Sequence, residues 1–219
     1  RLELQSQSFA LNGLLQDLAA LMGPLAAQKG LRFTLDNQLP PGLQATGDAM
    51  RVRQILLNLL SNAVKFTSRG TITLHARCDG ELRALHFEVR DTGPGISQEQ
   101  QQRLFRRFEQ ADGARTAAQY GGSGLGLAIC RELAHAMQGR IQVESQLGRG
   151  TCFGVTLPLP LVVDSDAEAS AEGHRDEATN MPPLRVLLVE DDATVADVVR
   201  GLLSARGHEV VHAGHALAA

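Results

Sequence analysis

Two asparagines one helical turn apart, Asn58 and Asn62, are the residues best suited to chemistry in this sequence. They lie in segment 54–67, where apolar residues recur at helical spacing and leave the asparagines on a different face. Carboxamide oxygens suit a hard cation such as Mg²⁺. Lys65 and Phe66 follow at the helix end, where an ammonium suits phosphate charge and a ring offers a stacking face. The segment predicts a metal–polyphosphate site, and the alternative is a core helix with solvated asparagines.

Four short blocks, rich in glycine or aromatic residues, follow this helix. They are residues 91–96, 104–109, 121–127 and 148–153. In this order, the helix and the blocks resemble the ATP-binding catalytic domain of sensor histidine kinases, which belongs to a superfamily shared with gyrase, Hsp90 and the MutL repair proteins. The resemblance covers roughly residues 1–160.

The resemblance implies how the base of ATP would be bound. Asp91 would accept a hydrogen bond from the adenine amino group, as a carboxylate at a strand end is able to do. Gly93 and Gly95 would let the backbone approach the base, because side chains there would occupy the pocket. Phe66 matches a residue packed on the purine. The alternatives are an ordinary strand-terminal Asp before a turn, and a Phe in the core.

The resemblance also implies which residues would contact Mg²⁺ and the phosphates of ATP. Asn62 matches the Mg²⁺ ligand and Asn58 a partner that helps to place metal and phosphates. Lys65 matches a phosphate contact, or is a solvated helix-end lysine. The other expected ATP contacts, mostly at the start of a helix where amides favour anions, are Gly122, Gly124, Leu125, Gly126, Leu127 and Thr151. These glycines do not form a Rossmann motif, because no apolar strand precedes them.

The residue at position 58 separates two classes of enzyme. Hydrolysing relatives carry there a Glu that activates water, whereas Asn58 is neutral and cannot act as a general base. The sequence therefore predicts a protein-histidine kinase domain that holds ATP and Mg²⁺ and presents the γ-phosphate to another acceptor. Two alternatives stay open: an ATP hydrolase of the gyrase/Hsp90/MutL type, and a degenerate, non-catalytic signalling scaffold.

The phosphate acceptor of the resembled kinases is a histidine on a preceding dimerisation hairpin. None of the seven histidines fits that context, so no catalytic histidine is expected here and the fragment should bind nucleotide without autophosphorylating. We expect a monomeric fragment of a homodimeric parent. The formal net charge is −3, so the composition does not indicate a basic surface that would bind nucleic acid.

The apolar patterns predict an α+β fold over residues 1–160. It is a two-layer α/β sandwich of the Bergerat type, with a mixed, mostly antiparallel sheet covered on one face by helices. Strands over 72–78 and 85–89 should form a hairpin around Asp79-Gly80. Asp48 should cap the asparagine helix, and Gly139 should end the helix that starts at 125.

A second, incomplete domain is expected after an acidic linker. Residues 164–180 are acidic and nearly free of large apolar groups, so the linker, placed at 161–183, should be flexible. Residues 184–219 read as strand, acidic turn, helix and strand, which resembles the start of a doubly wound α/β receiver domain. Asp191 and Asp192 match the acidic pair that holds Mg²⁺ in a complete receiver. The whole resembles a hybrid kinase, with transfer from ATP to His and then to a receiver Asp.

The amino-acid composition indicates the cellular compartment in which this chain works. Hydrophobic residues make up 43% of the chain, enough for a core. Three isolated cysteines without CxxC spacing indicate a reduced, cytoplasmic setting and no zinc site. No apolar run is long enough to span a bilayer. The chain is expected to be a piece of a longer protein, and a parent anchored in the inner (plasma) membrane stays open.

Overall fold

A five-stranded sheet forms the centre of the computed structural model, which describes residues 4–81, 83–105, 125–164, 184–190, 196, 199–201, 203–204 and 207–214. The strand order is β2-β4-β5-β7-β6. The bounds are β2 Leu31–Asn37, β4 Gly70–Cys78, β5 Leu85–Asp91, β6 Arg140–Gln146 and β7 Gly150–Leu157. Only the β2–β4 pair of this sheet is parallel. The predicted mixed, mostly antiparallel sheet and the β4–β5 hairpin are confirmed.

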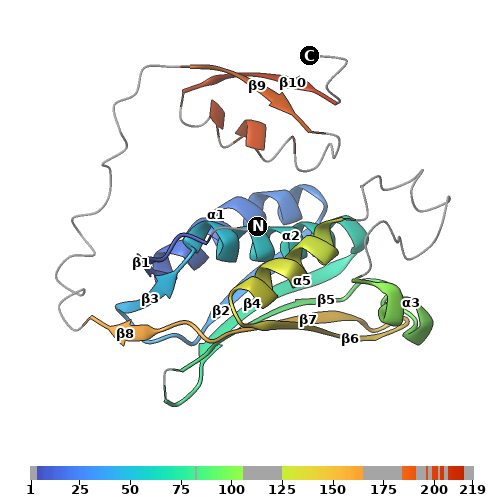
Figure 1. The fold of residues 1–219 in the computed structure, drawn as a ribbon. Helices are drawn as coiled ribbons and strands as arrows, with labels where there is room; N and C mark the ends of the chain where they lie inside the picture. Colours follow the sequence, from blue (N-terminus) through green and yellow to red (C-terminus); the bar gives the residue numbers. More distant parts are fainter. Residues whose placement is uncertain are drawn as a thin grey trace.

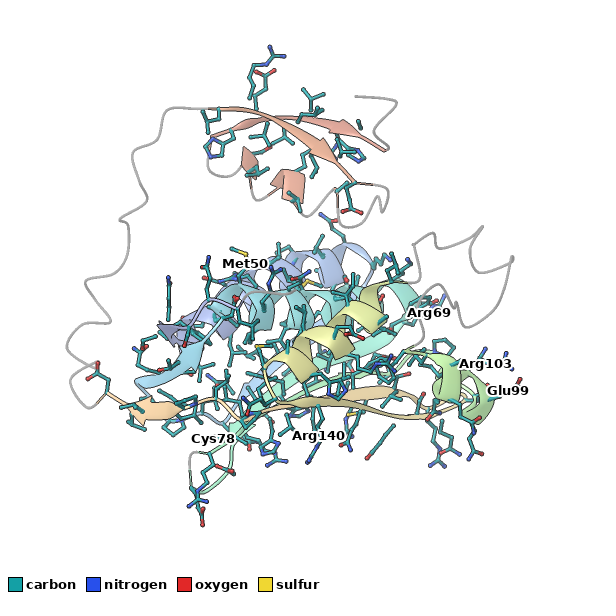
Figure 2. The ribbon with its side chains drawn as sticks, viewed as in Figure 1. Met50, Arg69, Cys78, Glu99, Arg103 and Arg140 are labelled. Carbon is teal, nitrogen blue, oxygen red and sulfur yellow. The ribbon has the colours of Figure 1, made fainter. Side chains whose placement is uncertain are left out.

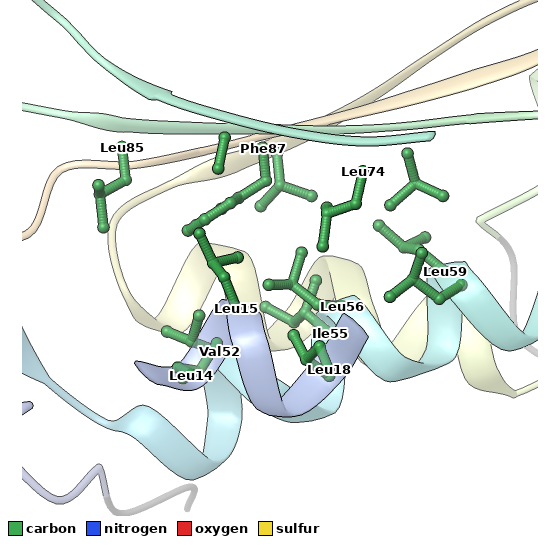
Figure 3. Packing of buried hydrophobic residues seen from close by; sticks show 14 of the residues in the cluster. Leu14, Leu15, Leu18, Val52, Ile55, Leu56, Leu59, Leu74, Leu85 and Phe87 are labelled. Atoms are coloured by element: carbon green, nitrogen blue, oxygen red, sulfur yellow. The ribbon is translucent and has the colours of Figure 1, made fainter. Parts of the chain in front are cut away.

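Three helices cover one face of this sheet (Figure 1). They are α1 Leu11–Gln28, α2 Ala49–Phe66 and α5 Gly126–Ala136. The apolar stripe of α2 is fully buried, and Figure 3 shows Leu56 and Leu59 packed towards Leu74 and Phe87 of the sheet. The opposite sheet face is polar, because strand residues alternate between the two faces. This confirms the predicted two-layer sandwich.

A smaller sheet lies beside the first and has the order β1-β3-β8. Its strands are β1 Gln7–Ala10, β3 Leu43–Gly47 and β8 Leu161–Val163. The expectation that 161–183 is all flexible linker is wrong for β8, which pairs antiparallel with β3. The main domain therefore extends at least through Val163, and its remaining boundaries stay a prediction.

Helix ends follow local side-chain chemistry. Asp48 caps α2 as predicted, with its Oδ1 accepting from the Arg51 amide at 3.0 Å. The short helix α3, Gln98–Arg103, starts with a reciprocal capping box between Ser97 and Gln100. Its exposed face carries Glu99 and Arg103 (Figure 2).

The expected stop of α5 at Gly139 is only partly right. The residue with left-handed backbone is Gln138, at φ 59°. Gly139 is needed for a different reason, since a Cβ atom there would overlap the carbonyl oxygen of Thr156 on β7. Close approach of helix end and strand, and not a left-handed cap, explains this glycine.

The C-terminal segment contains two strands, β9 Arg185–Val189 and β10 Glu209–Ala213, paired in parallel. Parallel pairing agrees with the expected strand–helix–strand unit, while its assignment to a receiver stays a prediction. Asp191 and Asp192 lie outside the described residues. Within the described part, no helix is long and apolar enough to cross a membrane.

Candidate nucleotide-binding site

Asp91 stands at the end of β5, opposite Thr151 of β7, and is only 8% exposed. Its Oδ1 accepts a hydrogen bond from the Gly93 amide at 2.8 Å. Burial raises the pKa of this carboxyl above its usual value, and the backbone amides of Gly93 and Thr151 partly oppose the shift. A buried carboxylate fixed in this way presents an acceptor to any donor that enters the site.

Thr67, which follows α2, was missed by sequence reasoning. Its side chain is 2% exposed, and a hydrogen bond from its hydroxyl is among the causes that oppose the raised pKa of Asp91. The contact with Asp91 does not reach ideal hydrogen-bond geometry, and no other described residue offers Thr67 Oγ1 a partner. Nothing in the pattern of the sequence distinguishes this hydroxyl from that of an exposed helix-end threonine.

The two glycines of the first block differ in what requires them. A Cβ atom on Gly93 would lie 2.8 Å from Asp91 Oδ1 and 3.1 Å from Thr67 Oγ1, so a side chain there would crowd both oxygens. Gly95 has φ +73°, and a Cβ there would overlap the carbonyl oxygen of Gln146. Gly93 fits the predicted role beside a ligand, whereas turn packing already explains Gly95.

Ser145 of β6 fixes the loop that follows Asp91. Its Oγ accepts from the Ile96 amide at 2.8 Å, donates to the Gly150 carbonyl at 2.8 Å and lies 3.0 Å from Thr151 Oγ1. Gln101 of α3 adds bonds from its Nε2 to the carbonyl oxygens of Ile96 and Ser145, at 2.8 and 2.9 Å. This network ties α3 and the glycine turn to β6 and β7, and so holds the Asp91 side of the site.

Replacing Ser145 with Ala is expected to lower the free energy of unfolding by about 1–3 kcal/mol, because the Ile96 amide and the Gly150 carbonyl lose their partner. Urea unfolding measures this change. Ser8→Ala, at an exposed residue of β1, is the matched control and should leave the midpoint unchanged. Equal stabilities of the two variants would contradict the assigned network.

The two asparagines of α2 contact each other as expected. Asn62 Nδ2 donates to Asn58 Oδ1 at 3.2 Å, so the planar Asn62 carboxamide turns its own oxygen away from Asn58. A Cβ on Gly126, the first residue of α5, would overlap Asn58 Nδ2. The structure thus places the helix start of the second glycine block directly against Asn58, and Asn58 orients Asn62.

Lys65 and Phe66 end α2, one turn after Asn62. The Lys65 Nζ lies 5.7 Å from the centroid of the Phe66 ring, and Phe66 is 41% exposed. Phe66 is therefore not the core residue that the alternative interpretation required. Its carbonyl oxygen faces Gly93, at 3.4 Å from where a Cβ would stand. The end of α2 thereby lies between the asparagine pair and the Gly93 turn that follows Asp91.

The remaining predicted contacts divide into two sets. Leu125 and Leu127 flank Gly126 at the start of α5, both partly buried, and Leu127 packs against the core. Gly122 and Gly124 lie outside the described residues. The described residues of the site therefore come from the end of β5, the start of β7, α2 and the start of α5.

A buried acceptor at a strand end, next to a helix that carries an oriented carboxamide pair, is the arrangement expected for a nucleotide-binding kinase or ATPase domain. The chain belongs to the family described as histidine kinase-, DNA gyrase B- and HSP90-like ATPase, whose pattern matches residues 47–161. The predicted resemblance to the ATP-binding domain of this superfamily is confirmed, while the receiver stays a prediction.

Curated relatives are sensor kinases. The chain is 40% identical over 210 residues to the aerobic respiration control sensor protein ArcB of Escherichia coli (strain K12), covering 96% of this chain and 26% of that protein. It is 41% identical over 223 residues to the sensor histidine kinase AruS of Pseudomonas aeruginosa, covering 98% of this chain and 21% of that protein. The chain thus spans about a quarter of the length of these relatives.

Solved structures agree with this assignment. Full-length ShkA in complex with AMPPNP superposes with a TM-score of 0.66 at 31% identity, covering 99% of this chain and 42% of that one. The catalytic domain of histidine kinase ThkA superposes with a TM-score of 0.60 at 25% identity, covering 70% of this chain and 95% of that one.

Proposed function

We propose that this chain is the ATP-binding catalytic part of a hybrid sensor histidine kinase, which presents the γ-phosphate of ATP to a histidine on a separate dimerisation hairpin. The observation that carries the proposal is the joint placement of Asp91 and the Asn58–Asn62 pair around the end of α2. The similarity to ShkA, solved with an ATP analogue, supports it.

The residues present fit a purine on one side of the site. The Asp91 carboxylate accepts from the adenine amino group, and the absent side chain at Gly93 leaves room for the base. The Thr67 hydroxyl beside Asp91 favours the ionised carboxylate that this contact requires.

The residues also fit a metal-bound triphosphate on the other side. Asn62 offers a carboxamide oxygen, the hard donor that Mg²⁺ accepts, and Asn58 fixes its direction. Bound Mg²⁺ would neutralise phosphate charge. The start of α5 contributes helix-terminal amides that favour anions, and Lys65 adds positive charge at the end of α2. Asn58 cannot activate water, so the γ-phosphate remains for a protein acceptor.

The segment from residue 184 onwards is proposed to be the start of the receiver that takes the phosphate from histidine. The parallel β9–β10 pair supports this proposal. Asp191 and Asp192 follow β9 in the sequence, where carboxylates would hold Mg²⁺ in a complete receiver.

Calorimetric titration with ADP and AMPPNP, together with an ATP hydrolysis assay, tests the function. Nucleotide binding without appreciable turnover is expected, followed by transfer of labelled γ-phosphate when the hairpin domain of the parent is added. Steady hydrolysis of ATP would favour the gyrase/Hsp90/MutL type of activity. A folded chain that binds no nucleotide would favour the signalling scaffold.

Replacing Asn62 with Ala should remove most of the benefit of Mg²⁺ for AMPPNP binding. Loss of a group next to a metal ligand typically weakens metal binding by about 10–100-fold, and loss of the ligand should do at least as much. Titrations with and without Mg²⁺ measure the effect. Gln54→Ala removes a carboxamide from an exposed position of the same helix and should keep the full Mg²⁺ dependence. An unchanged dependence in Asn62→Ala would exclude Asn62 as the ligand.

A further inference from the structure

The polar face of the main sheet, opposite the helices, carries a hollow that the nucleotide site does not use. Its volume is about 190 Å³, and it is lined by Gln38, His75, Ala76, Arg77, His86 and Glu88. Figure 2 shows Arg140 on this same face, which the helices leave uncovered. Asp91 belongs to the inward, buried set of β5 residues, so the hollow and the nucleotide site lie on opposite sides of the sheet.

Strand pairing places four outward side chains in one row across the sheet, at one edge of this hollow. Arg77 of β4 is paired with His86 of β5. His86 is paired in turn with Thr156 of β7, and Thr156 with Arg140 of β6. Neighbouring strands lie about 4.8 Å apart, so three strand spacings, about 14 Å, separate the backbones of the two arginines. Two long cationic side chains therefore flank two shorter polar ones.

The fold does not neutralise the two arginines of this row. Within the part of the chain that the structure describes, neither Arg77 nor Arg140 has an ion pair or a side-chain hydrogen bond. Glu88, the acidic residue that lines the hollow, already lies with its Oε2 3.6 Å from Arg90 Nη2. The row thus retains positive charge that no described acidic side chain pairs with.

His86 lies between these arginines, and its ionisation reflects their charge. Burial lowers the pKa of His86 most, and Arg77 lowers it further. Arg140 acts in the same direction, while Asp79 and Glu88 act in the opposite one. A bound anion would oppose the effect of both arginines and would favour the protonated ring.

The donors at this end of the hollow suit an oxyanion. A guanidinium binds a phosphate or a carboxylate through two parallel hydrogen bonds, because its N–H groups form a planar fork. His86 Nδ1 lies 3.3 Å from Thr156 Oγ1, which leaves Nε2 for a ligand. A protonated histidine donates from both ring nitrogens. Arg77 and His86 therefore combine a bidentate cation with a donor whose charge responds to the ligand.

We propose that this hollow is a second binding site, which holds a compact oxyanion, a phosphate or carboxylate group of a small molecule, between Arg77 and His86. Arg140 adds attractive charge from the other end of the row. The bound anion compensates cations that the fold leaves unpaired. This inference does not rest on the proposed function, because the two sites use opposite faces of the sheet.

The test is a titration of the folded chain with inorganic phosphate and with succinate, at constant ionic strength and with chloride as the reference anion. NMR signals of the His86 ring should shift in a saturable way. Arg77→Gln should weaken binding about tenfold or more, because a hydrogen bond between two charged groups is lost. Tighter binding of phosphate would assign a phosphate-bearing ligand, and tighter binding of succinate a carboxylate.

Arg32→Gln is the matched control for this titration. Arg32 is an exposed residue of β2 that pairs with Thr71, near the opposite end of β4 from Arg77. Its substitution makes the same charge change at a distance from the row, so this variant should bind both anions like wild type. Arg77→Gln and Arg32→Gln should also bind ADP like wild type.

The pKa of His86 gives a second readout, which a purely structural arginine would not move. The bound anion favours the protonated ring, so saturating phosphate or succinate should raise the pKa of His86 in wild type. The same anion concentration should raise it much less in Arg77→Gln. NMR titration of the ring against pH measures both values.

Three results would overturn the proposal. They are the absence of saturable anion binding to the folded chain, equal anion affinities of wild type and Arg77→Gln, and a pKa of His86 that saturating anion leaves unchanged. Each would place the anion elsewhere or nowhere on the chain. Failure of the folded chain to bind ADP would instead refute the proposed function and leave this inference standing.

Discussion

Replacing Asp91 with Asn is expected to weaken ADP binding by about 100-fold or more, because a buried hydrogen bond to a charged group is lost and a donor then faces the amino group of the base. The carboxylate is held by the Gly93 amide at 2.8 Å and is almost fully shielded from solvent. Water is therefore poorly placed to replace the lost interaction. Calorimetric titration with ADP measures the loss.

This loss should not come from unfolding. Burial raises the pKa of Asp91 in the folded state above its unfolded value, so the ionised group costs stability at neutral pH. Stability contributed by this residue is highest below the unfolded pKa and falls as pH rises through the folded pKa. Asp91→Asn removes the buried charge, and its thermal midpoint near pH 7 should equal or exceed that of wild type.

The same linkage predicts how binding depends on pH. A donor from the base favours the ionised carboxylate, so binding lowers the pKa of Asp91 and releases a proton where the free group is still protonated. Wild-type affinity for ADP should therefore decline on acidification through the pKa of the free protein, while Asp91→Asn stays flat. Glu88→Gln removes one carboxylate charge from the same strand, where Glu88 Oε2 lies 3.6 Å from Arg90 Nη2. This control variant should bind ADP like wild type. Equal ADP affinity of Asp91→Asn and wild type would refute the role of Asp91.

Residues with a periodic or type-specific pattern were predictable from the sequence. The apolar stripe of α2 forces Asn58 and Asn62 onto another face, and the structure joins them by a hydrogen bond. Asp48 and Ser97 cap helices because their short side chains reach the free amides of the first turn. Each of these features depends on neighbours within a few residues along the chain.

Features that depend on contacts between distant segments were not predictable. Thr67 is buried because β5 and its glycine turn pass over the end of α2, and no local pattern records that contact. Strand β8 looks like the start of a linker until β3 supplies a partner. Gly139 was predicted as a helix stop and Gly95 as a close approach to the base, but the carbonyl oxygens that exclude a side chain at these positions belong to β7 and to the end of β6.

Gly150 joins this second group and has the largest expected effect on stability. It begins β7 with φ +97°, a conformation that side-chain-bearing residues rarely adopt, and a Cβ there would overlap the carbonyl oxygen of Asp91. Left-handed backbone costs Ala about 1–2 kcal/mol, and a backbone overlap adds about 1–3 kcal/mol. Gly150→Ala should therefore lower the free energy of unfolding by about 2–5 kcal/mol.

The displaced atom belongs to Asp91, so Gly150→Ala should weaken ADP binding as well as stability. This pairing of effects separates it from Asp91→Asn, in which binding is lost and stability is kept. Gly154→Ala is the matched control, since it lies on the same strand and a Cβ there has nothing within 4 Å. Urea unfolding of both variants should show a large shift for Gly150→Ala and almost none for Gly154→Ala. Equal midpoints would mean that β7 can move away from Asp91 at little cost, and that the strand pair does not hold this carboxylate rigidly in place.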